Sequence, residues 1–421
     1  MSPKQHGRTY DLVVFGATGY TGKFTAQHIT THLSTDLKWA IAGRSRDKLE
    51  KLAAELKALN PDRLQPEIEI SDLTDAALSS LAKKTFVLIT TVGPYGQHGE
   101  HAFKACAENG THYLDVTGEI PFVAKMIKKY EHVAKQSGSM LFPEIGIESA
   151  PADLVAWSLA KQNRIEFGAK TAETIISVHK INTTPSGGTL ATALSFLDNF
   201  TLKEASESLK PFALSPVPNP IAEVAYSTPL QEKITGLRTV PNLGLLTTFI
   251  GGSTDTAIVH RTWGLFSQTH SKRHEFYGPN FNAREYMKTR NWLTGVFVHW
   301  GILLVGFLFV AIPPLRTLAK RFVYEQGQGP EVQESNEVEY RGVAEPDTDQ
   351  IIDKQVYCRA YFNGSLYALT GILLAQAAAT IIEDDIDLGG GGVFTAACLG
   401  EGFVDRLNSA GFKFETKSIT W

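Results

Sequence analysis

Asp11-Leu12-Val13-Val14-Phe15-Gly16-Ala17-Thr18-Gly19-Tyr20-Thr21-Gly22 is the stretch that decides the fold. An apolar run leads into three glycines, each separated from the next by two residues, and a helix is predicted over 23–33. A strand, a tight turn and a helix N-terminus present backbone N–H groups and a positive dipole end to a pyrophosphate. The context predicts a dinucleotide-binding site. The alternative is an ordinary strand-turn-helix unit with incidental glycines.

A second strand is predicted over 37–43, and the residues that follow it distinguish NADP(H) from NAD(H). Proteins that bind NAD usually carry an acid there, whereas this chain has Arg44-Ser45-Arg46. A guanidinium binds the 2′-phosphate of NADP bidentately and has no comparable use for a hydroxyl. The pattern favours NADP(H) over NAD(H). In the alternative, Arg44 and Arg46 are solvated residues that open the next helix, with Asp47 as its N-cap.

Helices and strands alternate as far as residue 150, as a parallel sheet requires. The further predicted strands are 67–70, 86–92, 112–116 and 140–143, and the predicted helices are 47–59, 75–84, 100–109 and 120–136. Because ligands lie beyond the carboxyl ends of such strands, the loop Val92-Gly93-Pro94-Tyr95 is expected beside the nicotinamide. Asp72, which follows the third strand, is expected either at the adenine amino group or as the cap of the next helix.

The composition is that of a globular protein with ample core, at 43% hydrophobic and 20% charged residues over 421 positions. The net charge of −4 does not favour nucleic-acid binding. Cys106, Cys358 and Cys398 are far apart and lack metal-ligand spacing, so neither a disulfide framework nor a metal site is expected. No apolar run precedes Leu12, so a signal peptide is not expected and the enzyme body should face the cytosol.

An α/β fold is predicted, with an N-terminal Rossmann doubly wound parallel sheet, a second α+β domain for substrate or dimerisation, and an inserted hydrophobic anchor segment. The predicted parts are an NADP-binding domain 1–150, an α+β substrate domain 151–291, an anchor 292–315 and the second part of the substrate domain 316–421.

Within the second domain, the Gly187-Gly188-Thr189 turn is expected to edge the active-site cleft. Strands are expected near 174–179, 245–250 and 257–259, a loop at 211–220, an exposed strand at 338–343 paired with 355–361, and a buried helix at 365–382. The loop Gly389–Gly392 is expected to close over substrate.

The anchor segment runs from Trp292 to Ile312 without a formal charge and then meets Pro313-Pro314. Its length suffices for a bilayer core, which takes about 20 residues. Basic residues flank it on both sides, which fits a single span poorly. They are Lys288 and Arg290 before it and Arg316, Lys320 and Arg321 after it. We interpret it as a monotopic anchor for a membrane or a lipid droplet. The alternative is a buried core helix or a dimer-interface helix.

Several motifs together resemble those of the saccharopine dehydrogenase-like oxidoreductases, which include trans-acting enoyl reductases. The matching segments are 16–22, Ala42-Gly43-Arg44-Ser45, Val92-Gly93-Pro94-Tyr95, 113–119, 146–153 and 391–395. Glu148 is a departure, since members often have Asp there. The resemblance implies a Rossmann domain, a second α+β domain, NAD(P)-linked redox chemistry and, from a vertebrate member, droplet association.

The sequence does not identify a single proton donor. Hydride transfer needs a proton donor near the reacting atom, and Tyr95 is our first candidate, followed by His98 and, more remotely, Asp115 or Glu119. Asp153 is expected to be a structural helix cap. The predicted cofactor contacts are Gly16, Ala17, Thr18, Gly19, Tyr20, Thr21, Gly22, Arg44, Ser45, Asp72, Val92, Gly93, Pro94, Tyr95, Thr117 and Gly118.

The sequence thus predicts an NAD(P)H-dependent oxidoreductase that reduces a double bond or carbonyl of a hydrophobic or lipid-linked substrate. The expected location is a lipid droplet or the cytosolic face of a membrane. The sequence is also compatible with a homodimer. Two alternatives remain: a cofactor-binding membrane or droplet protein without turnover, and a saccharopine-type amino-acid dehydrogenase. A saccharopine-type substrate carries carboxylates that need fixed cations, and the loops show no arginine constellation.

Overall fold

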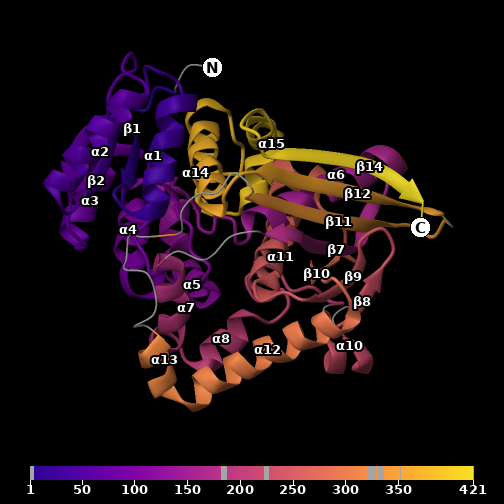
Figure 1. Ribbon diagram of the computed structural model, residues 1–421. Coiled ribbons are helices and arrows are strands. Elements are labelled where there is room, and N and C mark those ends of the chain that lie inside the picture. Colours follow the sequence, from indigo (N-terminus) through magenta and orange to yellow (C-terminus); the bar gives the residue numbers. More distant parts are fainter. Residues whose placement is uncertain are drawn as a thin grey trace.

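A computed structural model describes residues 4–181, 187–221, 227–319, 329, 336–350 and 352–420 of the chain. Two sheets of seven strands each form its framework. Figure 1 shows the first sheet and its helices in indigo and purple at the left, the second sheet at the right, and α14 between them. The C-terminal segments therefore return to the N-terminal domain.

The first sheet has the strand order β13-β6-β5-β4-β1-β2-β3, and every pair of neighbours is parallel. Its strands are β1 (Tyr10–Phe15), β2 (Trp39–Gly43), β3 (Glu67–Ile70), β4 (Thr85–Thr90), β5 (His112–Leu114), β6 (Met140–Phe142) and β13 (Gly392–Val393). The helices that connect β1 to β6 are α1 (Tyr20–His32), α2 (Arg46–Leu59), α3 (Asp75–Lys84), α4 (Tyr95–Asn109) and α5 (Ile120–Ser137). Helix α6 (Ala150–Phe167) leads from β6 to the second sheet. The predicted doubly wound Rossmann sheet is confirmed.

The fully buried strand β1 shows why the sheet is covered on both faces. Leu12 and Val14 belong to the core shared with α1, α2 and α14, while Val13 and Phe15 belong to the core shared with α3, α4 and α5. Successive side chains of a strand point to opposite faces, so a strand with helices on both sides reads as a continuous apolar run.

The second sheet has the order β14-β12-β11-β7-β10-β9-β8 and is antiparallel except for the β7–β10 pair. Its strands are β7 (Lys170–Ile181), β8 (Arg238–Val240), β9 (Gly244–Thr248), β10 (Asn282–Lys288), β11 (Glu337–Asp347), β12 (Lys354–Asn363) and β14 (Lys413–Thr420). The remaining helices are α7 (Gly187–Asn199), α8 (Leu202–Ser208), α10 (Leu230–Thr235), α11 (Gly252–Gln268), η1 (His270–Glu275), α12 (Trp292–Ala311), α13 (Pro313–Ala319), α14 (Leu366–Glu383), η3 (Ala396–Leu399) and α15 (Gly400–Ser409). The predicted α+β domain is confirmed.

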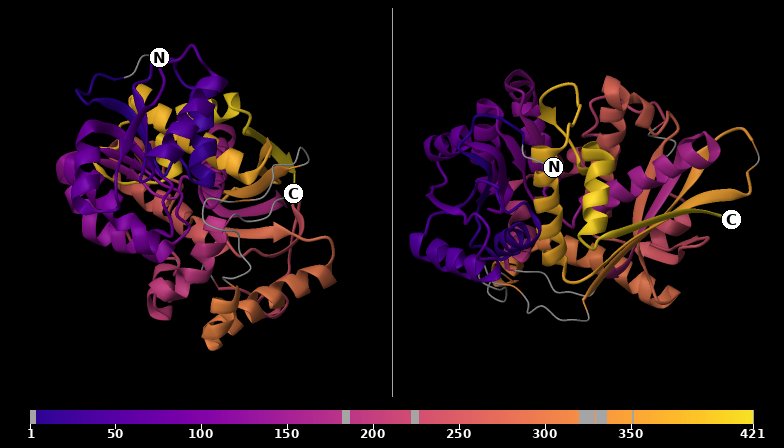
Figure 2. Two further views of the ribbon diagram at one scale, coloured as in Figure 1. Left: turned by 60° about the vertical axis from the view of Figure 1, so that its left-hand side comes forward. Right: turned by 90° about the horizontal axis from the view of Figure 1, so that it is seen from above.

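Helix α14 fastens the two parts of the molecule together, and Figure 2 shows it between the N-terminal domain and the second sheet. Gly371 lies against the backbone of α1, where a Cβ would come within 2.8 Å of the Phe24 carbonyl carbon. The Gln376 amide lies 2.9 Å from the buried imidazole of His28. The predicted burial of this apolar helix is confirmed.

Three local predictions are wrong. The expected strand at 257–259 lies inside α11, and the segment 338–343, expected as an exposed strand, is largely buried in β11 between β7 and β12. The loop expected to close over substrate ends in β13, where Gly392 pairs with Met140 at the edge of the first sheet. The hairpin partnership with 355–361 is confirmed, because β11 and β12 pair antiparallel.

Helix α12 lies on the surface, along the lower edge of the molecule in Figure 1. Gly295 and His299 are its only buried residues, while Phe297 and Phe307 are 69% and 65% exposed. The alternative of a buried core helix is therefore wrong. Arg316 in α13 lies 3.6 Å from Asp198 of α7, whereas Lys320 and Arg321 of the expected basic flank lie outside the described residues.

Candidate active site

The predicted phosphate turn has the expected geometry. Gly16 has a φ of +85°, and the Gly19 N–H donates to the Gly16 carbonyl oxygen at 2.9 Å. Helix α1 begins at Tyr20, earlier than predicted, and its N-cap Gly19 offers no side chain to the first turn. The N–H groups at this helix end are therefore open to a phosphate.

Two glycines in the turn occupy positions where a side chain would not fit. A Cβ on Gly16 would lie 2.7 Å from Val92 Cγ2, which places the loop after β4 directly against the turn. A Cβ on Gly22 would overlap the Gly16 carbonyl oxygen and lie 2.8 Å from the Ala17 Cα. Helix α1 thus lies as close to β1 as the predicted fingerprint requires.

Gly22→Ala is expected to lower the free energy of unfolding by about 1–3 kcal/mol and to weaken NADPH binding about tenfold or more, because α1 must move away from the turn. Thermal unfolding and nucleotide fluorescence titration measure the two effects. Gly301→Ala in α12 is the matched control, since a Cβ there would meet nothing within 4 Å. Equal behaviour of the two variants would contradict the packing argument.

Arg44 is exposed at the carboxyl end of β2 and makes no hydrogen bond or ion pair with a described residue. The neighbouring Arg46 instead lies 3.8 Å from Glu50. Ser45 is the N-cap of α2 and its hydroxyl makes no capping hydrogen bond. Arg44 and Ser45 are both available to a 2′-phosphate at this edge.

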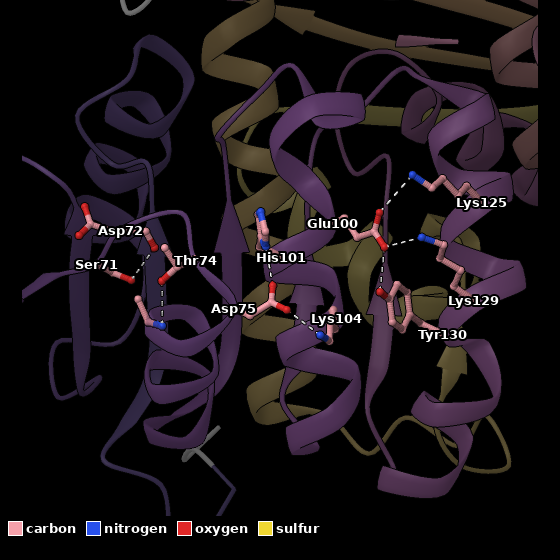
Figure 3. A network of polar contacts seen from close by, with 11 residues as sticks. Ser71, Asp72, Thr74, Asp75, Glu100, His101, Lys104, Lys125, Lys129 and Tyr130 are labelled. Atoms are coloured by element: carbon pink, nitrogen blue, oxygen red, sulfur yellow. Dashed lines mark hydrogen bonds and ion pairs between the residues drawn. The ribbon is translucent and has the colours of Figure 1, made fainter. Parts of the chain in front are cut away.

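Asp72 is exposed in the loop after β3 (Figure 3). The Thr74 hydroxyl caps α3 by accepting the Ala77 N–H at 3.3 Å, so the alternative role of Asp72 as the helix cap is wrong. Asp75 ties α3 to α4 through His101 and Lys104, at 2.5 and 2.6 Å. An adenine contact of Asp72 stays a prediction.

Tyr95, our first candidate donor, points into the protein. Its hydroxyl donates to the Thr90 carbonyl oxygen at 2.9 Å and accepts the Val116 N–H at 3.3 Å. Burial, together with Asp115, raises the pKa of the phenol well above its ordinary value. In this arrangement Tyr95 links the loops after β4 and β5, and its proton is already engaged.

His98 lies in α4 near Arg44, the predicted contact of the 2′-phosphate. It is half-buried in α4, and burial followed by the nearby positive charge of Arg44 lowers its pKa. The imidazole is thus close to the predicted 2′-phosphate position. A role as proton donor stays a prediction, but the surroundings of His98 belong to the adenosine end.

The loop after β5 is organised by two buried carboxylates. Asp115 accepts the Tyr113 hydroxyl at 2.6 Å and the backbone N–H groups of Thr117 and Glu144 at 3.0 and 2.9 Å. Glu119 accepts the first two N–H groups of α4, at 2.7 and 3.0 Å, and thereby caps that helix from another loop. The Thr117 hydroxyl is buried and accepts the Glu119 N–H at 3.1 Å. A Thr117 contact with cofactor stays a prediction.

Asp153 is buried and joins three segments. Its carboxylate accepts the Thr262 hydroxyl at 2.6 Å and the Ala397 N–H at 2.8 Å. Burial raises its pKa to about 7. The residue is structural, as expected, but it connects α6 to α11 and η3 instead of capping its own helix.

A group of carboxyls that the sequence did not reveal lies beyond the ends of β5 and β6. Ser149 is within 2.7 Å of Glu144 Oε2 and 3.2 Å of Asp255 Oδ1, although its hydroxyl has only one proton. Asp255 adjoins Glu285, and burial raises the pKa of both carboxyls, that of Asp255 to about 6. No group of His, Cys, Asp and Glu in the described ranges has the arrangement of a metal site.

Glu148 completes this group and faces the predicted cofactor loop. A Cβ on Gly118 would overlap the Glu148 carboxyl. The side chain is exposed to solvent, yet protein surrounds it so closely that this burial, together with Asp255 and Glu119, raises its pKa to about 8. An accessible group enclosed by protein lies in a recess.

A pocket of about 450 Å³ lies on the second sheet. Its lining residues are Val178, His179, Lys180, Ile181, Phe249, Met287, Lys288 and Glu337. Met287 is two positions from Glu285 on β10, so both side chains point to the same face. The Phe249 carbonyl accepts the Gly252 N–H at 3.2 Å, at the start of the helix that carries Asp255. Strand β10 and the start of α11 thus connect the pocket to Glu285 and Asp255.

The fold and the site define an NADP-binding oxidoreductase of the Rossmann type. Residues 12–142 match the family described as saccharopine dehydrogenase NADP binding domain. The chain is 29% identical over 444 residues to a saccharopine dehydrogenase-like oxidoreductase of Mus musculus, covering 98% of both chains. It is 27% identical over 432 residues to a trans-acting enoyl reductase of Mycobacterium bovis, covering 100% of both.

Among solved structures, a saccharopine dehydrogenase (L-Glu forming) from Saccharomyces cerevisiae has a similar fold, with a TM-score of 0.50, 11% identity, and coverage of 97% of this chain and 99% of that one. The similarity to saccharopine dehydrogenase-like oxidoreductases, which the motifs predicted, thus extends over the whole chain. NADP(H) is its cofactor, and the glycine turn and the open Arg44 fit that nucleotide.

Proposed function

We propose that this protein uses NADPH to reduce a double bond or a carbonyl of a hydrophobic or lipid-linked substrate at a membrane or lipid-droplet surface. The observation that carries the proposal is α12, a charge-free helix of 20 residues that lies almost wholly exposed on the protein. Large exposed apolar surfaces on soluble proteins mark contacts with membranes, ligands or other proteins.

Both ends of α12 are attached to the same body. The Gly295 carbonyl accepts the Thr247 hydroxyl at 2.8 Å, and His299 lies 2.7 Å from the Thr248 hydroxyl, while α13 approaches α7 through Arg316 and Asp198. A helix held at both ends on one side favours contact with a surface over a transmembrane span. The proposed location is the cytosolic face of a membrane or a droplet monolayer.

Two pocket residues are close in the chain to α12 or to the strand that it contacts. Phe249 follows Thr248, the partner of His299, and Lys288 precedes α12 by four positions. Val178, Ile181 and Met287 provide apolar walls suited to a lipid chain. Substrate would thus enter the enzyme from the phase in which it dissolves.

The charges around the site disfavour a saccharopine-type substrate. Glu144, Glu148, Asp255 and Glu285 gather where such a substrate would need cations for its carboxylates. Lys180 is paired with Glu337 at 2.9 Å. An uncharged reacting group suits this arrangement better than a dicarboxylate.

Within the reaction, the bound NADPH supplies the hydride. The glycine turn and the α1 N-terminus would hold the pyrophosphate, and Arg44 would hold the 2′-phosphate. Glu119 fixes the start of α4, and Tyr95 fixes the loops after β4 and β5, so that the nicotinamide end meets a rigid wall.

The test is incubation of purified protein with deuterium-labelled NADPH and fractionated lipid extract, followed by mass spectrometry. We expect loss of nicotinamide absorbance and transfer of deuterium into a lipid of one fraction. Tight NADPH binding without label in any product would favour a cofactor-binding protein without turnover. Label in an amino-acid product, when the aqueous fraction is supplied, would favour the saccharopine-type alternative.

A further inference from the structure

The reduction proposed above requires a proton as well as a hydride, and neither predicted donor is well placed to give it. The Tyr95 hydroxyl is engaged with Thr90 and Val116. His98 lies near Arg44, at the end of the site that would hold the 2′-phosphate. The proton source must therefore lie elsewhere along the carboxyl edge of the first sheet.

Glu148 lies at that edge, in the connection from β6 to α6. Its carboxyl is packed against Gly118, in the loop after β5, and remains exposed to solvent. It makes no hydrogen bond to a residue in the described part of the chain. A carboxyl in such a recess is accessible to a ligand while its own hydrogen-bonding capacity is unused.

The elements packed around Glu148 contribute acids. Glu119 faces it from the loop before α5, Asp255 from α11, and Glu285 from β10, while Glu144 precedes it in its own loop. Tyr340 of β11 is also close, and its hydroxyl donates to the Ile147 carbonyl oxygen at 3.1 Å. Several carboxylates this close cannot all be ionised, so some are protonated at neutral pH.

Within the described part of the chain, Glu285 lacks hydrogen-bond donors, as Glu148 does. Both of its oxygens are buried without a donor among the described residues, although Asp255 adjoins it. Burial and the neighbouring carboxyl both disfavour a second negative charge in this pair, and they raise the pKa of Glu285. The group around Glu148 therefore favours protonated carboxyls next to a recess that opens to solvent.

We propose that Glu148 stands as a neutral carboxylic acid beside the nicotinamide end of the site and gives the substrate its proton. This inference rests on the proposed reductase function. Hydride addition to one atom of the double bond moves the electron pair to the other atom, which takes the proton of the Glu148 carboxyl. Glu148 is left as a carboxylate and regains a proton from water.

Proton release on nucleotide binding tests this placement without a substrate. The oxidised nicotinamide ring carries a positive charge that the reduced ring lacks, so NADP+ should drive the proton off a carboxyl beside it. At pH 7 we expect binding of NADP+ to release about 0.5 to 1 proton per site more than binding of NADPH. Calorimetry in phosphate and Tris buffers measures this difference, in which the 2′-phosphate cancels because both forms carry it.

Glu148→Gln should abolish the difference and leave the NADPH Kd within about threefold. Glu166→Gln is the matched control, an exposed carboxylate on α6, and should keep the full difference. If Glu148→Gln fails to fold, Glu148→Asp replaces it: the extra release should persist with a shifted midpoint pH between pH 6 and 9.

A wild-type protein that releases equal protons with both nucleotides would overturn the proposal, as would a full difference in folded Glu148→Gln or an unshifted midpoint in Glu148→Asp. Failure to find a lipid substrate or a membrane would count against the proposed function and leave this readout unaffected. The experiments therefore distinguish a failure of the proposed function from a failure of the proton-donor role of Glu148.

Discussion

Arg44→Asp is expected to weaken NADPH binding about 100- to 1000-fold and to change NADH binding by less than about threefold. The guanidinium has no partner among the described residues, so its hydrogen bonds are available to a 2′-phosphate. Hydrogen bonds to charged groups contribute about 1.5–3 kcal/mol each, and the new carboxylate adds repulsion against the phosphate. NADH carries a hydroxyl at that position, so its binding depends neither on those hydrogen bonds nor on that repulsion.

Fluorescence titration of both reduced nucleotides at fixed salt measures the two dissociation constants. Arg46→Asp is the matched control, because it makes the same charge change two residues away at a side chain directed toward Glu50. It should alter NADPH binding by less than about fivefold. Equal losses for NADPH and NADH in Arg44→Asp would show that Arg44 does not read the 2′-phosphate.

The first sheet was predictable because its determinants are local. The run from Asp11 to Phe15, the glycine spacing and the alternating pattern each specify an element within a short window. Even so, α1 begins at Tyr20 and not at Lys23, because Gly19 takes the N-cap position and the helix includes Gly22. The part played by β13 was not predictable, since a Gly-rich segment becomes a strand there only through pairing with β6.

The wrong strand at 257–259 has a physical cause. Helix α11 is buried nearly all round, so its apolar residues lack the helical spacing that marks an amphipathic helix. A short apolar run within it looks like a buried strand. Only its packing against α6 and β10 distinguishes the two.

The nucleotide end of the site was predictable, and the chemical end was not. The carboxyls of Glu144, Asp255 and Glu285 come from three separated segments, and no local pattern connects them. Tyr95 was chosen for its loop, but the direction of its side chain depends on Thr90 and Val116. One usable signal was present in the sequence: Glu148 follows the last strand of the doubly wound unit, where ligands are expected.

Two apolar helices, α12 and α14, satisfy the length and hydropathy of a membrane span, yet only 11% of the apolar window is buried in α12 against 83% in α14. Small residues line α14, and Gly371 allows α1 to approach closely. Bulky Phe and Trp side chains project from α12. Side-chain size was thus a better guide to burial than mean hydropathy.

The combined substitution Phe297→Glu, Leu304→Glu and Phe307→Glu is expected to reduce membrane partitioning by at least about 1000-fold, because each large apolar side chain contributes about 1.5–3 kcal/mol when fully buried. The three side chains are 69%, 57% and 65% exposed, so the protein fold should be unaffected. Flotation with phosphatidylcholine–phosphatidylserine vesicles, and with triolein droplets under a phosphatidylcholine monolayer, measures the partitioning. NADPH affinity and Tm should match the wild type.

The matched control replaces three exposed apolar residues elsewhere, Leu59, Ile165 and Leu202, by Glu, which adds the same charge and should leave partitioning within about threefold. Flotation of the α12 variant at the wild-type level would contradict the anchor. A wild-type dimer that this variant converts to monomers, with no flotation of either protein, would instead show that α12 packs against a second copy. Gly295 and His299 attach α12 to Thr247 and Thr248, directly before the pocket residue Phe249. Loss of the surface contact should therefore also lower reduction of substrate supplied in vesicles, while reduction of the same substrate in detergent is unchanged.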